Sequence, residues 1–529
     1  MKTIKQHLNY TPKQSAMQVM LPLDLGLKIG IEESVRLLIE VTERMDYTRL
    51  DAAYDRKPRS NEATPKQMFQ IIVYGFMKGV YSTRALEEAC RNDIRFMYLL
   101  GDKKIPDHSR FASFIQKRLN DNVAENLFYQ FIKQLQEMGE ISFENIFVDG
   151  TKIEANANRY SFVWAKSTDK YDAKLKAKIG ALLENLKLSY LFPLQDKTTI
   201  TEVLLALQQE AKKQNIQFVQ GRGKRKTQLQ RDIELLSSYL SRQQKYDNYK
   251  GIFKGRNSFS KTDKDATFMR MKEDHMRNGQ LKPAYNLQLG VEGEYIVGID
   301  ISCERSDELT LLNLLNKVKN GCGKYHKNVV ADAGYESEEN YKSVLKNGQI
   351  PYIKPQNYER SKKRKYKNNI FLRENMPYND KDDTYTCPAG NKFVALYNTI
   401  RRSKSKFEST VTVYGCLGCN DCSLKSKCTR AKGNRKISVS KDFATLRKQT
   451  LDRLQSDTGK LLRLNRSIQS EGVFGVIKQD YGIRRFLRRG NENVFTETVL
   501  YSLGFNINKL YNKRMQNRLG VMLHKLKAA

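Results

Sequence analysis

Long hydrophobic runs are missing from this chain. No stretch of about 18 consecutive apolar residues occurs within its 529 residues, which argues against a membrane-spanning helix. The opening residues, MKTIKQHLNYTPKQ, contain no hydrophobic core of a secretory signal peptide. We therefore expect a soluble protein of the cell interior with no membrane partner.

Acidic residues are scarce relative to basic ones. The chain has 93 Lys and Arg against 58 Asp and Glu, which gives a formal net charge of +35. This balance favours a polyanionic partner and an affinity that falls as salt rises. A ribosomal or other RNA-binding protein would have the same balance, so charge alone does not identify the nucleic acid.

One carboxylate stands among many cations in the stretch 461–490, LLRLNRSIQSEGVFGVIKQDYGIRRFLRRG. Read as a helix, this stretch has one face that contains Leu464, Ile468, Glu471, Phe474 and Lys478. Glycines beside Glu471 would let that face pack closely on a sheet. A Glu buried there as an ion needs a cation, hydrogen bonds or a metal. The alternative is that Glu471 only borders an apolar stripe.

Two further carboxylates follow strands of the buried type. In ENIFVDGTKIEA an apolar run leads into Asp149, and in KNVVADAGYESEENY another leads into Asp332; small residues come next in both. Sheets of α/β proteins present functional groups beyond the carboxyl ends of their strands. Either Asp alone could be a turn residue. Asp, Asp and Glu on strand, strand and late helix of a basic protein together indicate one site.

These motifs resemble those of DDE transposases of bacterial insertion sequences. The branch concerned has an N-terminal helical domain and a cysteine-bearing insertion in a ribonuclease-H-like core. Asp149 in FVDGTKIEA, Asp332 in VVADAGYES and Glu471 in SEGVFGVIK match the catalytic motifs, and Lys478 follows. AYNLQLGVE and DELTLLNLL match the core hairpin and helix, so the resemblance covers most of the chain.

The resemblance fails at one point. Related elements often carry Tyr and Arg seven and four residues before the Glu, where this chain has Leu464 and Ser467. Arg463 and Arg466 are nearby. We expect a set of cations to contact DNA phosphates: Lys152, Lys478, Arg466, Arg484, Arg485, Arg488 and Arg489.

Three converging carboxylates repel one another, so the arrangement favours hard divalent cations, Mg²⁺ or Mn²⁺, held by Asp149, Asp332 and Glu471. Two such ions would activate the nucleophile and stabilise the leaving oxygen. The resemblance implies a bacterial cytoplasmic protein at the nucleoid. It implies binding to terminal inverted repeats, cleavage at the element ends and joining to target DNA, by a homodimer in the protein–DNA complex. The alternatives are a metal-dependent nuclease of the same fold and a catalytically idle, transposase-derived DNA-binding protein.

The expected fold class is α/β, with a ribonuclease-H-like mixed sheet. Residues 1–138 are predicted to form an all-α DNA-binding domain, and 139–510 the catalytic core. A helical insertion at 155–267 and a basic, Cys-rich insertion at 359–440 interrupt the core, and 511–529 form a basic tail. The order of elements in the core fits a mixed sheet and fits poorly with a purely parallel one.

The N-terminal region has the pattern of short helices joined by tight turns. Thr64 and Pro65 mark a helix start. The pattern suits a helix-turn-helix module with Ser109, Arg110 and Ser113 on a recognition helix. A helical bundle used for dimerisation fits it nearly as well.

The insertion at 155–267 contains two long amphipathic helical patterns, joined through the basic loop QGRGKRKTQ. It would serve either as a scaffold or dimer arm, or as a DNA clamp through Arg222, Lys224, Arg225 and Lys226. Trp164, the one tryptophan, either packs at its base, which is the simpler reading, or stacks on an unpaired base.

Five of the eight cysteines gather in the second insertion, after the basic run 359–369, which is a solvated loop or a DNA contact. Their spacing indicates metal ligation in a reducing compartment better than a disulfide framework. We predict one structural Zn²⁺, because so small a polar insertion needs a cross-link to fold. Iron–sulfur ligation and free thiols are the alternatives. The candidate ligands are Cys387, Cys416, Cys419, Cys422 and Cys428.

Overall fold

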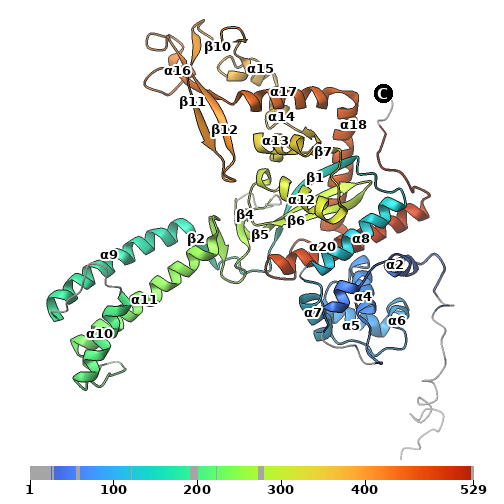
Figure 1. Ribbon diagram of the computed structural model, residues 1–529, viewed down its shortest axis with the longest axis horizontal. Coiled ribbons are helices and arrows are strands. Elements are labelled where there is room, and N and C mark those ends of the chain that lie inside the picture. Colours follow the sequence, from blue (N-terminus) through green and yellow to red (C-terminus); the bar gives the residue numbers. More distant parts are fainter. Residues whose placement is uncertain are drawn as a thin grey trace, which may run out of the picture.

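The structure is a computed structural model, and it describes residues 26, 29–54, 60–120, 122–190, 200–221, 223–271 and 279–525. Helices at the N-terminal end pack below a mixed sheet, a helical arm projects to one side, and a second sheet stands above (Figure 1). Within the described residues, no helix combines the length and the hydrophobicity that a membrane crossing requires.

The N-terminal region is helical, and polar side chains cap α4, α5, α6 and α7. Thr64 caps α4 with its side chain and Gln67 returns the hydrogen bond, so a capping box begins the helix as its sequence predicts. The helices are α2 (Ser34–Glu43), α3 (Thr48–Ala52), α4 (Pro65–Met77), α5 (Thr83–Asn92), α6 (Ile94–Leu100), α7 (His108–Lys117) and α8 (Val123–Glu137).

The central sheet mixes parallel and antiparallel strands. In order across the sheet its strands are β4 (Thr267–Arg270), β5 (Leu281–Glu292), β1 (Asn145–Glu154), β7 (Asn328–Ala331) and β8 (Ile350–Ile353), and β6 (Tyr295–Ser302) also pairs with β5. β1 runs antiparallel to β5 and parallel to β7, which runs parallel to β8. The predicted mixed α/β fold with a helical N-terminal region is confirmed.

The turn between β5 and β6 contains Gly293 at φ 60°, as the sequence predicts. α12 (Leu311–Cys322) and α13 (Glu338–Lys346) connect the later strands. α12 ends at Cys322, because Gly323 supplies the left-handed C-cap at φ 86°.

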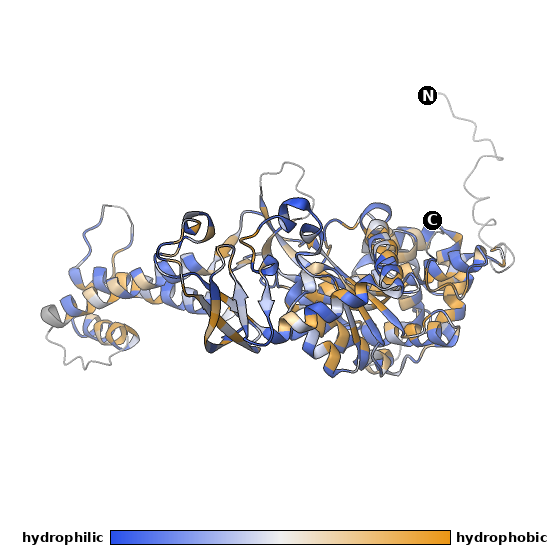
Figure 2. Ribbon diagram, turned by 90° about the horizontal axis from the view of Figure 1, so that it is seen from above, coloured by the Kyte–Doolittle hydropathy of each residue, from blue (hydrophilic) through white to orange (hydrophobic). Residues whose placement is uncertain are grey.

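α20 (Asn491–Met515) joins the N-terminal helices to the sheet. It packs against β6 on one side and against α4 and α8 on the other, and most of its residues are buried. One continuous hydrophobic cluster therefore runs from the N-terminal helices through α20 into the sheet. The hydropathy colouring shows hydrophobic residues gathered in this part of the molecule (Figure 2).

The arm is a set of three helices on a short two-stranded base. The first predicted helical pattern is two helices, α9 (Ala165–Tyr190) and α10 (Ile200–Lys213), and the second is α11 (Gln228–Phe253). Its base pairs β2 (Phe162–Trp164) with β3 (Ser258–Ser260). Trp164 lies against the rings of Phe162 and Phe268, so the packing interpretation of this residue is the one the structure favours.

The second insertion contains a five-stranded antiparallel sheet, which its sequence did not predict. The strands are β9 (Tyr378–Asn379), β10 (Thr384–Thr386), β11 (Lys392–Arg402), β12 (Glu408–Cys416) and β13 (Lys436–Val439). The basic run before it forms the short helices α14 (Tyr358–Ser361) and α15 (Arg364–Lys367), and α16 (Lys425–Cys428) lies near the cysteines. The insertion has its own small hydrophobic cluster around Phe393 and Tyr414, which includes Cys387, Cys416 and Cys419.

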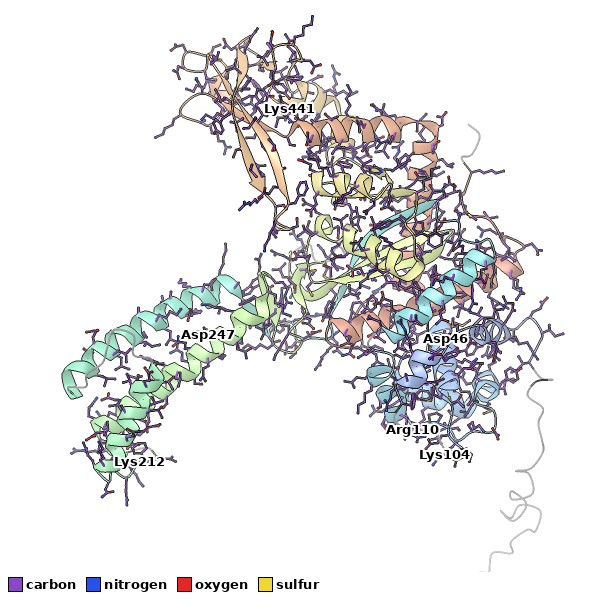
Figure 3. All side chains as sticks on the ribbon, in the orientation of Figure 1. Asp46, Lys104, Arg110, Lys212, Asp247 and Lys441 are labelled. Carbon is purple, nitrogen blue, oxygen red and sulfur yellow. The ribbon has the colours of Figure 1, made fainter. Side chains whose placement is uncertain are left out.

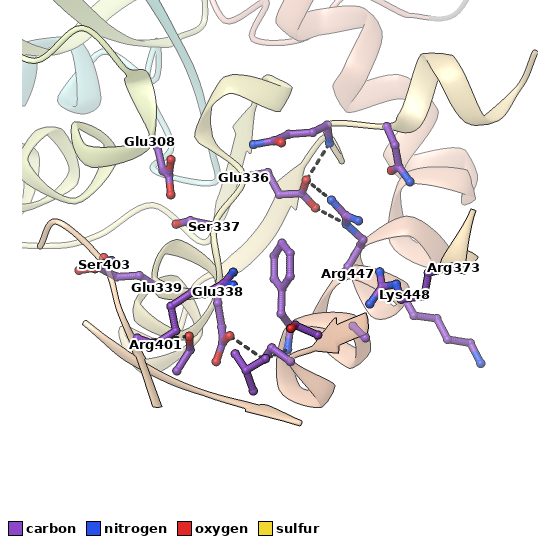
Figure 4. A pocket seen from close by; sticks show the side chains of 18 of the residues that line it. Glu308, Glu336, Ser337, Glu338, Glu339, Arg373, Arg401, Ser403, Arg447 and Lys448 are labelled. Atoms are coloured by element: carbon purple, nitrogen blue, oxygen red, sulfur yellow. Dashed lines mark hydrogen bonds and ion pairs between the residues drawn. The ribbon is translucent and has the colours of Figure 1, made fainter. Parts of the chain in front are cut away.

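α17 (Lys441–Gln455) connects the second sheet to the core. Arg447 donates two hydrogen bonds, each 2.6 Å long, to the fully buried carboxylate of Glu336, which follows β7 (Figure 4). A cavity of about 1020 Å³ lies between this pair and the β11–β12 hairpin. α18 (Asp457–Arg466) then leads the chain back across the sheet.

Candidate active site

Asp149 and Asp332 come next to each other because of the register of two parallel strands. Val148 on β1 is the partner of Ala331 on β7, so the next residue along each chain is an aspartate. Asp332 follows the end of β7, whereas Asp149 lies inside β1, which stays paired with β5 as far as Glu154. Asp149 Oδ1 accepts a hydrogen bond from the amide of Gly150 (2.8 Å). Asp332 begins a 3-10 turn at Ala333–Tyr335, and its carbonyl accepts the amide of Tyr335 (3.1 Å).

Glu471 lies on a helix that changes its winding twice. Ser467–Glu471 and Val476–Asp480 are π turns, with a short α turn, α19 (Gly472–Gly475), between them. A π turn brings residues i and i+5 onto one side, whereas an α-helix separates them. Arg466 and Glu471 therefore face the same way.

The predicted helix face is wrong for this reason. Glu471 is 62% exposed and Ile468 is 40% exposed. Phe474 is buried as predicted, and the rest of the buried side is formed by Leu462, Asn465, Gln469, Ser470, Val473 and Ile477. A Cβ atom on Gly472 or Gly475 would meet no atom within 4 Å, so these glycines do not provide close packing.

The site has a strand half, Asp149 and Asp332, and a helix half, Glu471. Arg466 lies between Asp149 and Glu471. One guanidinium nitrogen lies 3.5 Å from Asp149 Oδ2, and another lies 3.7 Å from Glu471 Oε1. The Arg466 side chain is 15% exposed, so little water screens these contacts. A cation thus sits between two of the predicted carboxylates.

Asp332 acts electrostatically on the same buried hydroxyl as Asp149 and Arg466. Burial raises the pKa of the Tyr335 hydroxyl well above its usual value, and the charges of Asp307, Asp149 and Asp332 raise it further, while Arg466 opposes them. All four charged groups therefore act on one buried hydroxyl. Carboxylate oxygens are the donors that Mg²⁺ prefers, so the donor set suits a hard divalent cation.

The spacing of the carboxylates is set in part by Arg466. Among the residues that the structure describes, no three His, Cys, Asp or Glu side chains are close enough together to hold an ion as they stand. For Asp149 and Glu471 the reason is visible, because Arg466 bridges them. Displacement of this guanidinium would leave both carboxylates available.

Several predicted phosphate contacts meet in one pocket. Lys152 from β1, Lys478 from the second π turn, and Arg484 and Arg485 from the following loop line a cavity of about 320 Å³. Lys282, Arg159 and Glu154 also line it, and the last two are paired at 3.0 Å. The pocket is therefore strongly cationic, which suits a phosphate-bearing ligand.

The arginines of the 484–489 loop have different roles. Arg485 donates to the carbonyls of Ala155 and Ala157, and Arg489 donates to the carbonyl of Asn156, so both hold the segment after β1. Arg488 is partly buried beside Glu497. Burial lowers the pKa of Arg488, and the charge of Glu497 opposes this. Arg484 is exposed and lines the cationic pocket.

The sequence analysis missed a layer of amides under the site. Asn286 and Gln288 are fully buried on β5, and their side chains bond to each other and to Asp307. The signal was available: two amides at i and i+2 in the apolar strand AYNLQLGVE point to one face of the sheet.

The five cysteines of the second insertion line one small cavity of about 20 Å³. Backbone and side-chain nitrogens already point at three of the sulfurs. The amide of Asn391 donates to Cys387 (3.2 Å), the amide of Arg435 to Cys419 (3.4 Å), and the guanidinium of Arg435 to Cys428 (3.0 Å).

Comparison with known proteins identifies two regions. Residues 386–511 match the model of a family described as "Transposase DDE domain", and residues 31–117 match one described as "Transposase domain (DUF772)". The first region contains Glu471 and the cationic loop, and the second contains α2 to α7. No curated protein and no solved structure matches the chain. A transposase DDE domain implies phosphoryl transfer on DNA in the course of transposition.

Proposed function

We propose that this protein binds the terminal inverted repeats of an insertion sequence, cleaves the DNA at the element ends and joins those ends to target DNA. The observation that carries the proposal is the meeting of Asp149, in the middle of the central strand, with Glu471 through Arg466. The sheet supports it too. An antiparallel hairpin, the central strand and two parallel strands follow in the order of a ribonuclease-H-like core.

In this proposal Asp149, Asp332 and Glu471 hold Mg²⁺ or Mn²⁺. Bound divalent cations would supply a polarised nucleophile and charge stabilisation at the leaving oxygen. Arg466 leaves the carboxylates as they bind cations, and its guanidinium turns to the DNA backbone. Lys152, Lys478 and the neighbouring arginines hold phosphates so that the scissile bond lies at the strand ends.

The carboxylates are tested one at a time in the full-length protein. Asp149→Asn, Asp332→Asn and Glu471→Gln keep shape and remove charge, so each should abolish Mg²⁺-dependent cleavage and joining while binding to end DNA persists. Asp442→Asn, which removes an exposed carboxylate of α17, is the matched control. The substrate is DNA flanking the gene, where inverted repeats are expected. Wild-type activity in any of the three variants would contradict the role of that residue.

The same assay separates the alternatives. Cleavage by the wild-type protein without joining of pre-cut ends would identify a nuclease of the same fold. Binding to end DNA with neither reaction, in Mg²⁺ or Mn²⁺, would identify a catalytically idle DNA-binding protein.

We propose that α7 reads the element ends. Ser109, Arg110 and Ser113 are exposed on this helix, and Arg110 lies at the outer end of the N-terminal region (Figure 3). Its guanidinium pairs with Glu62 at 2.7 Å, an exposed ion pair that can exchange for a DNA contact. Because α20 shares its packing with these helices, point substitutions test this role better than deletion of residues 1–138.

Arg110→Ala combined with Ser113→Ala should reduce the preference for end DNA over random DNA, measured by competition binding. Arg91→Ala, which removes an exposed arginine of α5, should leave the preference unchanged. An unchanged preference in the first variant would favour the dimerisation bundle instead.

We further propose that the arm contributes to a homodimer on DNA. Lys224 and Arg225 are exposed in the loop between α10 and α11, Lys226 pairs with Glu234 at 2.6 Å, and Arg222 lies outside the described residues. A Lys224→Glu and Arg225→Glu variant distinguishes the two roles. Weaker DNA binding with an unchanged dimer favours the clamp, whereas unchanged DNA binding favours the scaffold.

The second metal proposal is a structural Zn²⁺ in the Cys-rich insertion. Support comes from the common cavity of the five thiols and from the N–H groups directed at three sulfurs, since such hydrogen bonds stabilise metal-bound thiolates. Elemental analysis of protein purified without added metal should find one zinc. Cys419→Ser with Cys422→Ser should release it, whereas Cys90→Ser should not. Iron with visible absorbance, or no metal, would contradict zinc.

A further inference from the structure

A fourth carboxylate lies beside the strand half of the site. Asp307 begins the 3-10 turn Asp307–Leu309 that leads into α12. Its Oδ1 accepts hydrogen bonds from Asn286 Nδ2 (2.7 Å) and from Gln288 Nε2 (3.1 Å). Both donors are buried amides of β5, so Asp307 is tied to the strand that pairs with β1.

The network reaches the backbone beside both aspartates, through a hydrogen bond on the Asp332 side and through the strand register on the Asp149 side. Gln288 Oε1 accepts the hydroxyl of Tyr335, whose own amide donates to the carbonyl of Asp332. Gln288 also lies opposite Gly150, the residue after Asp149, in the register of β5 and β1. Asp307 is therefore connected to the backbone beside each aspartate through neutral side chains.

Two glycines make room for this network. A Cβ atom on Gly150 would lie 2.3 Å from Gln288 Nε2, and one on Gly334 would lie 3.3 Å from Asp307 Oδ2. The first distance is a severe clash and the second is a tight contact. Gly150 follows Asp149, and Gly334 lies two residues after Asp332. Both positions need a glycine because the side chains of Gln288 and Asp307 pack against them.

The charge of Asp307 is not neutralised by a neighbour. In the described part of the chain, no Lys, Arg or His pairs with this carboxylate, and its hydrogen-bond donors are uncharged amides. Its charge nevertheless acts on the Tyr335 hydroxyl together with those of Asp149 and Asp332. A negative charge held this way, next to two others, attracts a cation to the common site.

We propose that Asp307 is a positioning residue of the divalent-cation site, which holds Gln288 and Tyr335 against the two aspartates and adds a fourth negative charge. The proposal rests on the proposed function, since it concerns the same cation site. It predicts that Asp307 sets the affinity for the cation without touching the DNA. Outer residues of metal sites typically change metal affinity by about 10-fold or more when they are replaced.

The test measures the binding of Mn²⁺ alone to the full-length protein. Electron paramagnetic resonance of the free ion gives the bound fraction. Asp307→Asn keeps the shape and an acceptor for the two amides but removes the charge. It should raise the apparent Kd for Mn²⁺ about 10-fold, with an unchanged Tm. Glu308→Gln removes the same charge from the next residue, which points to a surface cavity, and should leave the Kd unchanged.

A second variant protects the test against misfolding. Tyr335→Phe removes only the hydroxyl that bonds Gln288, and it should raise the Kd about threefold. Wild-type Mn²⁺ affinity in both Asp307→Asn and Tyr335→Phe would overturn the proposal, as would equal weakening by Asp307→Asn and Glu308→Gln. A wild-type protein that binds Mn²⁺ in this pattern but never cuts end DNA would overturn the proposed function alone.

Discussion

Asp149 lies inside β1 and Asp332 directly follows β7, two strands that are hydrogen-bonded to each other, whereas Glu471 stands on a helix interrupted by two π turns. The Asp149 side chain is 16% exposed and that of Glu471 is 62% exposed. A backbone ladder and buried amides fix the strand half. The helix half has open space around its glycines. On the proposed function, the comparison teaches that the strand half is preformed and that the helix half adjusts when cations and DNA bind.

The C-terminal segment fixes the helix half from outside. Asn465 bonds to the backbone of His524 through both atoms of its amide, and Gln469 donates to the carbonyl of Met522 (2.9 Å). Gln469 also accepts the amide of Glu294 in the β5–β6 turn (3.1 Å). Residues 516–525 therefore connect the helix of Glu471 to the edge of the central sheet.

The largest effect is expected from Lys513→Met, which breaks the anchor of that segment. Lys513 and Glu140 form an ion pair at 2.5 Å, each 1% exposed, and Lys513 also donates to the carbonyl of Val521 (3.1 Å). Loss of one partner leaves a buried charge, so the free energy of unfolding should fall by about 3–5 kcal/mol. Urea unfolding measures it.

The control is the double variant Lys513→Met with Glu140→Gln. Removal of both charges should cost less than the sum of the single changes, because no buried charge then remains unpaired. Strict additivity of the two changes would mean that the pair is not coupled in solution.

The next largest effect on stability is expected when a glycine of the strand half, Gly150, is replaced, and Gly472 of the helix half is the comparison. Gly150→Ala places a methyl group against Gln288, and should lower the free energy of unfolding by about 1–3 kcal/mol. Gly472→Ala meets no atom within 4 Å and should be neutral or stabilising by up to about 1 kcal/mol. Thermal unfolding compares them. Equal losses in both variants would mean that the helix half is packed as tightly as the strand half.

A smaller effect should follow from Gln469→Ala. It removes the bonds to Met522 and Glu294, and should cost about 1–2 kcal/mol. The loss should be local: hydrogen exchange should increase in 467–480 and 516–525 and stay unchanged in β1 and β7. Increased exchange in the strands would show that the two halves open together.

The same difference explains what the sequence could predict. Asp149 and Asp332 each follow a short apolar run, which is a local signal, so their neighbouring positions follow from parallel pairing of the two runs. The face of the Glu471 helix could not be predicted, because a π turn depends on tertiary contacts such as those of Asn465 and Gln469. The strands of the second insertion were missed because β11 is largely exposed and its apolar residues, FVALY, are consecutive, without the alternation that marks a half-buried strand.

The amide layer and Asp307 were missed for another reason. The hydrogen bonds that define them join positions about 20 to 50 residues apart, such as Asn286 with Asp307 and Gln288 with Tyr335. No local pattern encodes which of several buried polar groups will meet. A strand with two buried-side amides indicates only that partners exist.

The smallest expected effect on stability concerns Glu292 and Glu294, at the turn between β5 and β6. Glu292 is bonded within the sheet region, whereas Glu294 is bonded to the C-terminal segment that holds the helix half. Glu292 accepts hydrogen bonds from Ser142 and from the buried His326, whereas Glu294 pairs with Lys509, Arg518 and His524 near the surface.

Burial raises the pKa of each carboxyl, but the partners outweigh it and hold both pKa values below the usual 4.5. The stability that each contributes is therefore present above pH 4.5 and lost as pH falls through the lower folded pKa.

Because Lys509 and Arg518 are partly exposed, Glu294→Gln should cost less than about 1 kcal/mol at pH 7. Salt at about 0.5 M should remove most of that cost, because it screens exposed charges. The cost of Glu292→Gln should persist in salt, since its carboxylate and its partner His326 are both buried. Urea unfolding of both variants at pH 7, with and without salt, measures the difference, and equal salt sensitivity would show that the two anchors are equally exposed to solvent.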